Sequence, residues 1–318
     1  MRGLRVPVAA ATAMLALLDA RDAAMLAAAQ TAVVAPLSEL WVEPEPGRDL
    51  FSGPGGAKLA PNPSVTYKVI KIKEGGFSEG YTVLDPEQRQ WSIKLYPEAR
   101  TEVVASRIAW ALGYHQPPAY TLEQWLADGA QSENPQPVAR FREEKPAFHG
   151  LTEMGSWSYA TSPFRGTRPL AGLLVLNVML ANSDLKDVNN MIYALSETRE
   201  GARRWYVARD LGQTFGRAGG ATGSNSGSLR DDVEEFDRTK FIKGTKNGKV
   251  EFDFPAKYKA FFEDITPADV RWICGRLSRL SDQQWSDAFR AGGYAEPTAQ
   301  RYIRRLKQKI AEGLELGS

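Results

Sequence analysis

The order of the candidate elements is the feature that most constrains the fold of this chain. Three short runs between Val65 and Leu95 have the composition of β-strands, and a helical spacing of apolar residues follows from about Pro97 to Leu112. Further strand-like runs are Ala119–Leu122 and Pro137–Phe141, whereas a strongly apolar helix is expected over Pro169–Ala181 and capped helices beyond Thr266. Strands first and helices afterwards favour an α+β fold. We expect a β-rich N-terminal lobe followed by a helical C-terminal lobe.

The length of the chain allows these two lobes. It has 318 residues, and a domain takes roughly 100–200. Residues 36–64 are rich in proline and glycine and predict an extended lead-in. We therefore place the N-terminal lobe at 65–150 and the helical C-terminal lobe at 151–318.

Residues 1–35 form a candidate leader segment. Arg2 and Arg5 precede an apolar run from Val6 to Leu18, and small residues follow, as in a secretory signal. The charged cluster at 19–22 and the alanines after it fit an alanine-rich helix equally well, so both interpretations stay open, and with them a cytoplasmic or an exported location. No later run approaches the ~20 apolar residues of a membrane span.

The composition excludes several classes of site. The net charge of +2 gives no electrostatic reason to expect nucleic acid as a partner. Cys274 is the only cysteine, and His115 and His149 are the only histidines. A disulfide framework and a cysteine- or histidine-rich metal centre are therefore excluded.

One motif follows the apolar helix directly: Asp184-Leu185-Lys186-x-x-Asn189. Phosphoryl transfer from ATP needs a carboxylate that orients the attacking hydroxyl, a cation beside the phosphate and groups that hold magnesium. At this spacing Asp184 can serve as the catalytic base, Lys186 can lie along the phosphate, and Asn189 can turn back to the metal. Asp210, in Asp210-Leu211-Gly212, comes 21 positions after Asn189 and offers the oxygen ligand that Mg²⁺ prefers.

A lysine for the nucleotide is expected on the third strand. Lys94 lies there, and a carboxylate on the next helix must fix its ammonium. Glu102 is the preferred partner. Glu98 is the competitor, but it lies in the first helical turn, where a carboxylate already has a role in countering the helix dipole.

A glycine-rich turn joins the first two strands and is a candidate cover for the phosphates. Its alternative is an ordinary hairpin. The glycines concerned are Gly75, Gly76 and Gly80.

Together these residues resemble the protein-kinase-like superfamily. The run Asp184 to Ile192 resembles the catalytic loop of eukaryotic Ser/Thr kinases, and Asp210-Leu211-Gly212 resembles their metal-binding D-F-G. The surrounding pattern is closer to the atypical branch. Glu102 with the run Arg107 to Gly113 resembles the helix after the catalytic lysine in HipA-type kinases, and Asn182 before Asp184 resembles the catalytic loop of HipA-type, CotH-type and phosphoinositide kinases. The resemblance covers about residues 65–215. It implies Lys94 and Glu102 as the nucleotide pair, Asp184 as base, and Asn189 and Asp210 as metal ligands.

The sequence departs from the typical protein-kinase pattern in three ways, which leave the phosphate acceptor open. Asp184 lacks the histidine that stands two positions earlier in the H-R-D form, only eight positions separate Lys94 from Glu102, and no A-P-E motif follows the glycine- and serine-rich stretch at 216–228. We expect an ATP- and Mg²⁺-dependent kinase that acts on a hydroxyl, with a protein Ser/Thr as first choice and a lipid or small alcohol also open. The alternative is a pseudokinase that binds nucleotide or a partner without turnover.

Overall fold

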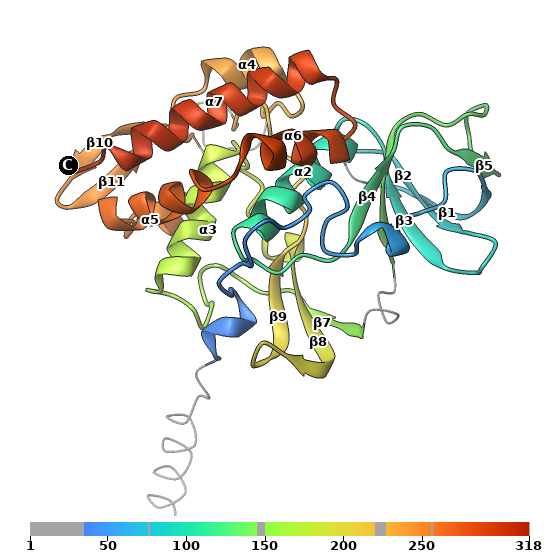
Figure 1. Cartoon of the computed structure of the whole chain (residues 1–318), viewed down its shortest axis with the longest axis horizontal. Helices are drawn as coiled ribbons and strands as arrows, with labels where there is room; N and C mark the ends of the chain where they lie inside the picture. The colour runs from blue at the N-terminus through green and yellow to red at the C-terminus, as the bar shows by residue number, and fades with distance from the viewer. Residues whose placement is uncertain (1–34, 76, 145–149, 220–226, 256, 318) are drawn as a thin grey trace, which may run out of the picture. The chain divides into compact units, whose positions relative to one another are not determined.

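The computed structural model describes residues 35–75, 77–144, 150–219, 227–255 and 257–317. The candidate leader, Gly76 and His149 therefore lie outside the described residues, apart from Ala35. Residues 36–318 form a unit of their own, separate from residues 1–35. Figure 1 shows a curled sheet on one side of this unit and most helices on the other.

A six-stranded sheet is built from the first half of the unit. Its strand order is β4-β6-β3-β2-β1-β5, and all neighbours are antiparallel except β1 and β5. The strands are β1 (Thr66–Lys73), β2 (Gly80–Leu84), β3 (Gln90–Lys94), β4 (Ala119–Leu122), β5 (Leu126–Asp128) and β6 (Ala139–Glu143).

The sheet buries one aromatic face. Trp125 contacts Phe141 edge to face with ring centroids 5.3 Å apart, and Tyr67 lies 5.1 Å from Phe141. Trp91 and Ile93 alternate along β3 and are almost fully buried in the same cluster. Alternating apolar residues on β3 thus hold its register, which fixes where Lys94 at its end points.

Helix α2 (Glu98–Ala111) packs against β4, β6 and α6. It ends as the sequence predicts, because Gly113 has a φ of +96° and a Cβ there would lie 2.0 Å from the carbonyl oxygen of Val42. The segment before β1 includes two 3-10 turns, η1 (Leu37–Glu39) and η2 (Ala57–Leu59). This segment packs on the sheet, since the Tyr120 hydroxyl donates to the carbonyl of Gly56 over 2.9 Å.

Helices dominate the second half. Thr266 and Ser281 cap α5 and α6 with reciprocal side-chain bonds, and α7 lies along α4, α5 and α6 (Figure 1). The helices and 3-10 turns are α3 (Arg168–Met179), η4 (Asp187–Asn189), α4 (Val233–Arg238), η5 (Lys259–Phe262), α5 (Pro267–Leu277), α6 (Asp282–Ala291) and α7 (Glu296–Leu314). Two small antiparallel sheets comprise β7 (Leu151–Gly155), β8 (Asn190–Arg199) and β9 (Ala202–Ala208), and β10 (Ile242–Lys246) with β11 (Lys249–Phe252).

The expected α+β class is confirmed. A sheet-rich first half precedes a second half in which helices prevail. Within the described ranges, no helix combines the length and the apolar character that crossing a membrane requires.

Candidate active site

A pocket of about 520 Å³ brings the central predicted residues together. Its walls come from the glycine-rich turn, β3, α2, the loop after α3 and the segment after β9. The lining residues are Phe77, Ser78, Lys94, Glu98, Asp184, Lys186, Asn189, Asp210, Gln213, Gly227, Ser228 and Arg230. Residues more than 100 positions apart in the sequence therefore face one space.

Lys94 is the centre of the charge network on one wall. Its Nζ lies 2.6 Å from Oδ1 of Asp210, 2.8 Å from Oε2 of Glu102 and 3.2 Å from Oε2 of Glu98. Burial opposes the charged amine, but the carboxylates of Glu102 and Asp210 outweigh it and raise the pKa of Lys94. Lys94 is therefore a fixed cation, and both candidate acids contact it, Glu102 more closely.

Glu102 is buried behind Lys94 and has two further cationic partners. Its Oε1 lies 3.0 Å from Nε of Arg140 and 2.7 Å from Nη1 of Arg142. Burial would raise the pKa of Glu102, yet Arg140, Lys94 and Arg142 together lower it. The carboxylate stays ionised and holds the ammonium of Lys94 in place.

Glu98 begins α2 and bridges two cations. Besides Lys94 it contacts Arg230, whose Nε lies 3.2 Å from Oε1 of Glu98. Its side chain also lies against Gly212, where an added Cβ would be 2.7 Å from Cβ of Glu98. Gly212 is thus required for a close approach between α2 and the Asp210 loop, and not for a positive φ.

A chain of asparagines positions the loop after α3. Asn177 donates to the carbonyl of Leu173 over 2.9 Å, and Asn182 donates to Oδ1 of Asn177 over 2.7 Å. Oδ1 of Asn182 then accepts from the backbone N–H of Asp184 over 3.1 Å. The strongly apolar α3 is buried and therefore rigid, and these hydrogen bonds fix the backbone of Asp184 relative to it.

The loop residues also hold one another. Nζ of Lys186 lies 2.9 Å from Oδ1 of Asp184. Asn189 donates its side-chain N–H to the carbonyl of Asp184 over 2.7 Å, and its own carbonyl accepts from the N–H of Asp210 over 3.0 Å. Asp184, Asn189 and Asp210 are therefore fixed relative to one another by backbone contacts.

The donor set fits a divalent metal of the magnesium type. Burial would raise the pKa of Asp210, but Lys94, Arg142 and Arg140 hold it well below its usual value, so the carboxylate is anionic and could serve as an oxygen ligand. The amide nitrogen of Asn189 is used on Asp184, so its amide oxygen would be the atom to offer a metal. In the described part of the chain no three His, Cys, Asp or Glu gather into a metal site. Two protein ligands suit Mg²⁺, which keeps waters and binds substrate phosphates.

The glycine-rich turn borders the pocket through its other residues. Phe77 and Ser78 line it, whereas Gly75 and Gly80 do not, and Gly76 is outside the described residues. Gly75 has a φ of +75° and begins the turn. At Gly80 a Cβ would lie 2.3 Å from the carbonyl oxygen of Ile93, so this glycine serves the β2–β3 pairing.

Three arginines of the site were not anticipated from the sequence. Arg140 and Arg142 are two positions apart on β6, and Arg140 pairs in register with Lys94 on β3. Their alternation on a predicted strand is the signal that could have found them. Arg230 follows the glycine- and serine-rich stretch, and no sequence pattern marks it.

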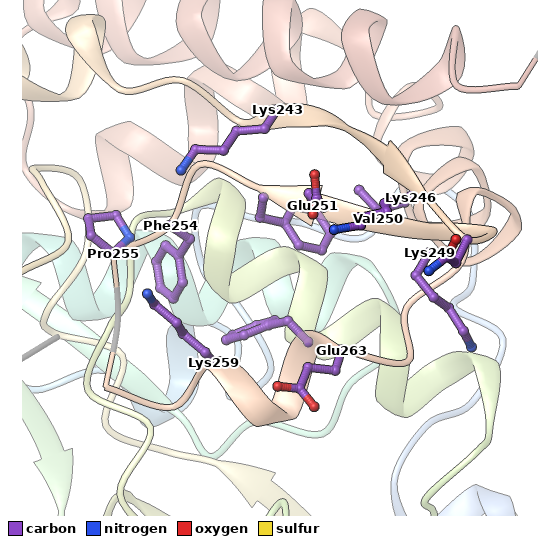
Figure 2. A pocket seen from close by; sticks show the side chains of 12 residues that line it. Lys243, Lys246, Lys249, Val250, Glu251, Phe254, Pro255, Lys259 and Glu263 are labelled. Carbon is purple, nitrogen blue, oxygen red and sulfur yellow. The ribbon is translucent and has the colours of Figure 1, made fainter.

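A second pocket, of about 580 Å³, lies between the β10–β11 hairpin and η5. Figure 2 shows Lys243 and Lys259 on opposite sides of Phe254. Lys243 is 3.1 Å from Asp253, and Lys249 is 3.7 Å from Asp264. None of the predicted site residues lines this pocket.

Comparisons with known proteins gave similar solved structures, and the three given next are each described as a kinase. The Helicobacter pylori proinflammatory kinase CtkA is 13% identical, with a TM-score of 0.46, over 79% of this chain and 98% of that one. The Golgi casein kinase is 11% identical, with a TM-score of 0.40, over 80% and 74% of the two chains. The Golgi casein kinase with Mn/ADP bound is 11% identical, with a TM-score of 0.38, over 80% and 73%. No protein-family model and no curated protein matches the sequence.

Proposed function

We propose that this chain is an atypical kinase of the protein-kinase-like superfamily, which transfers the terminal phosphate of ATP to a hydroxyl in the presence of Mg²⁺. The observation that carries the proposal is the single pocket that Lys94, Asp184, Lys186, Asn189 and Asp210 share. These residues supply cations that bind phosphate, a base and two metal ligands, which is the combination that phosphoryl transfer needs.

Each residue has a definite task in this proposal. Lys94, fixed by Glu102, binds the phosphates of the nucleotide, and Asn189 and Asp210 hold the metal. Mg²⁺ bound there supplies charge neutralisation for the phosphate oxygens. Asp184 orients the acceptor hydroxyl and takes its proton, and Lys186, 2.9 Å from that carboxylate, lies beside the transferred group.

The acceptor that we propose first is a Ser or Thr hydroxyl of a protein. The support is the resemblance of the Asp184–Asn189 loop to that of Ser/Thr kinases. A lipid head group or a small alcohol would use the same base, and radiolabelled ATP offered with each acceptor class separates the three.

The proposal is tested by two substitutions with different expected effects. Asp184→Asn should lower the rate of ATP consumption about 10²–10⁴-fold while ATP–Mg²⁺ binding stays within about twofold, because the base acts only in the transition state. Asp210→Asn should weaken ATP–Mg²⁺ binding itself, measured by titration calorimetry.

Asp187→Asn is the matched control, since Asp187 is an exposed carboxylate of the same loop that does not line the pocket. Its kinetics should equal those of the natural chain. Nucleotide binding without any turnover by the natural chain would establish the pseudokinase alternative instead. If Asp210→Asn leaves nucleotide affinity unchanged, the kinase proposal is wrong.

A further inference from the structure

Arg230 occupies the pocket from a side that the proposed mechanism does not use. Its backbone is fixed, because Leu229 and Arg217 exchange hydrogen bonds of 2.9 and 3.0 Å and Asp231 donates to the carbonyl of Thr214 over 3.2 Å. Gly216 allows this close pairing, since a Cβ there would lie 2.2 Å from the carbonyl oxygen of Leu229. The guanidinium is thus held in place at the pocket wall.

The guanidinium is buried but incompletely paired. The side chain is only 7% exposed, its Nε contacts Glu98, and its Cζ lies 3.3 Å from the ring centroid of Phe77 on the glycine-rich turn. Nη1 has no hydrogen-bond partner among the described residues. A buried guanidinium donor without an acceptor costs free energy, and a phosphate oxygen would remove that cost.

The charges around Arg230 differ from those around Lys94. Burial lowers the pKa of Arg230, while Glu98, Asp184 and Asp210 raise it. The carboxylates that act most strongly on Lys94 are Glu102, Asp210 and Glu98. Arg230, like Lys186, is therefore a pocket cation that interacts with the proposed base Asp184, whereas Lys94 lies against Glu102.

We propose that Arg230 is a further catalytic residue that contacts the terminal phosphate of the bound nucleoside triphosphate. This inference rests on the proposed function. A planar fork of donors beside Asp184 suits the phosphate that is being transferred, because its charge is spread over several oxygens. Glu98, which touches both Lys94 and Arg230, spaces the two cations.

The test compares two nucleotides, ADP–Mg²⁺ and the nonhydrolysable β,γ-imido analogue of ATP with Mg²⁺. Titration calorimetry is run on the natural chain, Arg230→Gln and Arg230→Lys. Arg230→Gln should weaken binding of the ATP analogue at least about tenfold and leave ADP affinity within about twofold, since only the analogue carries a third, γ-phosphate. Arg230→Lys should recover part of the loss, and kcat should fall about 10³-fold in Arg230→Gln.

Arg238→Gln is the matched control. Arg238 does not line the pocket, and its exposed side chain pairs with Glu235 at 2.7 Å. It should leave both affinities unchanged.

Three outcomes would overturn the inference. Equal weakening of both nucleotides in Arg230→Gln would show a positioning role through Glu98 and Phe77. Unchanged affinities with a lower melting temperature would show a purely structural role. If the natural chain binds both nucleotides, either result overturns the Arg230 role alone, whereas absence of binding by the natural chain overturns the proposed function as well.

Discussion

Glu102 is a carboxylate that contacts three cations while its side chain is only 1% exposed. Its removal would leave Lys94, Arg140 and Arg142 buried with too little negative charge. Breaking a buried ion pair of this kind costs about 3–5 kcal/mol. We predict that Glu102→Gln lowers the free energy of unfolding by this amount, measured by urea denaturation.

Glu98→Gln is the comparison for that prediction. Glu98 is more exposed than Glu102 and has Lys94 and Arg230 as its cationic partners. The loss of stability should be smaller. Equal losses in the two variants would contradict the central place of Glu102 in the network.

Among single residues, those of the local motifs could be predicted from the sequence, whereas the residues that hold these motifs in place could not. The Asp184 loop and Asp210 could be recognised because each needs only a short spacing and a preceding helix or strand. Arg230 reaches the site through a loop closure that no local pattern encodes. The alternation of Arg142 with Arg140 is visible in the sequence, but the strand that Arg142 pairs with is not. Gly212 could be singled out, but its contact with Glu98 depends on a packing distance that only the fold reveals.

Among the elements, η1 is attached to the rest of the chain through His115. The Nε2–H of His115 donates to the carbonyl of Ser38 over 2.7 Å, and its ring stacks on Trp205 of β9 with centroids 4.7 Å apart. Burial lowers the pKa of His115 to about 4, so the folded ring stays neutral where the unfolded one is protonated.

This attachment predicts an acid-sensitive contribution to stability. Since the folded pKa lies below the unfolded value, the contribution is complete above about pH 6.5 and is lost as the pH falls toward 4, by about 3 kcal/mol. Urea denaturation at several pH values, on the natural chain and on His115→Gln, measures it. The difference between the two curves should change across this window, and a constant difference would refute the role of His115.

Helix α7 places a buried lysine at the end of α3. Nζ of Lys309 donates to the carbonyl of Met179 over 2.8 Å and lies 4.2 Å from the ring centroid of Phe236. Burial lowers the pKa of Lys309 to about 7, with Arg305 acting in the same direction and Glu312 opposing it. The unfolded chain therefore binds a proton between about pH 7 and 10 that the folded chain has released.

We predict that the free energy of unfolding gains about 2 kcal/mol from this group between pH 7 and 9. Lys309→Met should abolish that gain, since it fills the space without a titrating group. Thermal unfolding of both chains across this pH range provides the measurement. An unchanged slope in the variant would show that the amine does not titrate there.

The longer elements were predictable because their signals are local. The capped helices α5 and α6 and the apolar α3 follow from propensity and capping chemistry. The short strands β5 and β7 were missed, since three to five residues carry little periodicity and are stabilised by pairing with distant partners. Helix α4 has six residues and its helicity depends on packing against α7.

At the scale of the whole unit, residues 36–318, nucleotide binding should raise the free energy of unfolding. A ligand that binds only the folded chain stabilises it by about 2.7 kcal/mol at 100 times its Kd. We predict that ATP with Mg²⁺ raises the melting temperature and that EDTA removes most of the increase, because Asp210 and Asn189 need the cation to bind the phosphates.

A thermal-shift series with ATP, GTP and ADP, each with and without Mg²⁺, provides the measurement. Asp210→Asn is the control that should show no metal-dependent shift. Equal shifts with and without the cation would contradict the metal site.

The contact between Glu98 and Gly212 has a mechanical consequence. The first turn of α2 fits against the loop of Asp210, and Thr101 of the same helix donates to the carbonyl of Gly212 over 2.7 Å. Movement of the helix is thereby coupled to movement of the loop. A partner that displaced the far end of α2 would shift the proposed metal ligand Asp210 without contacting the pocket itself.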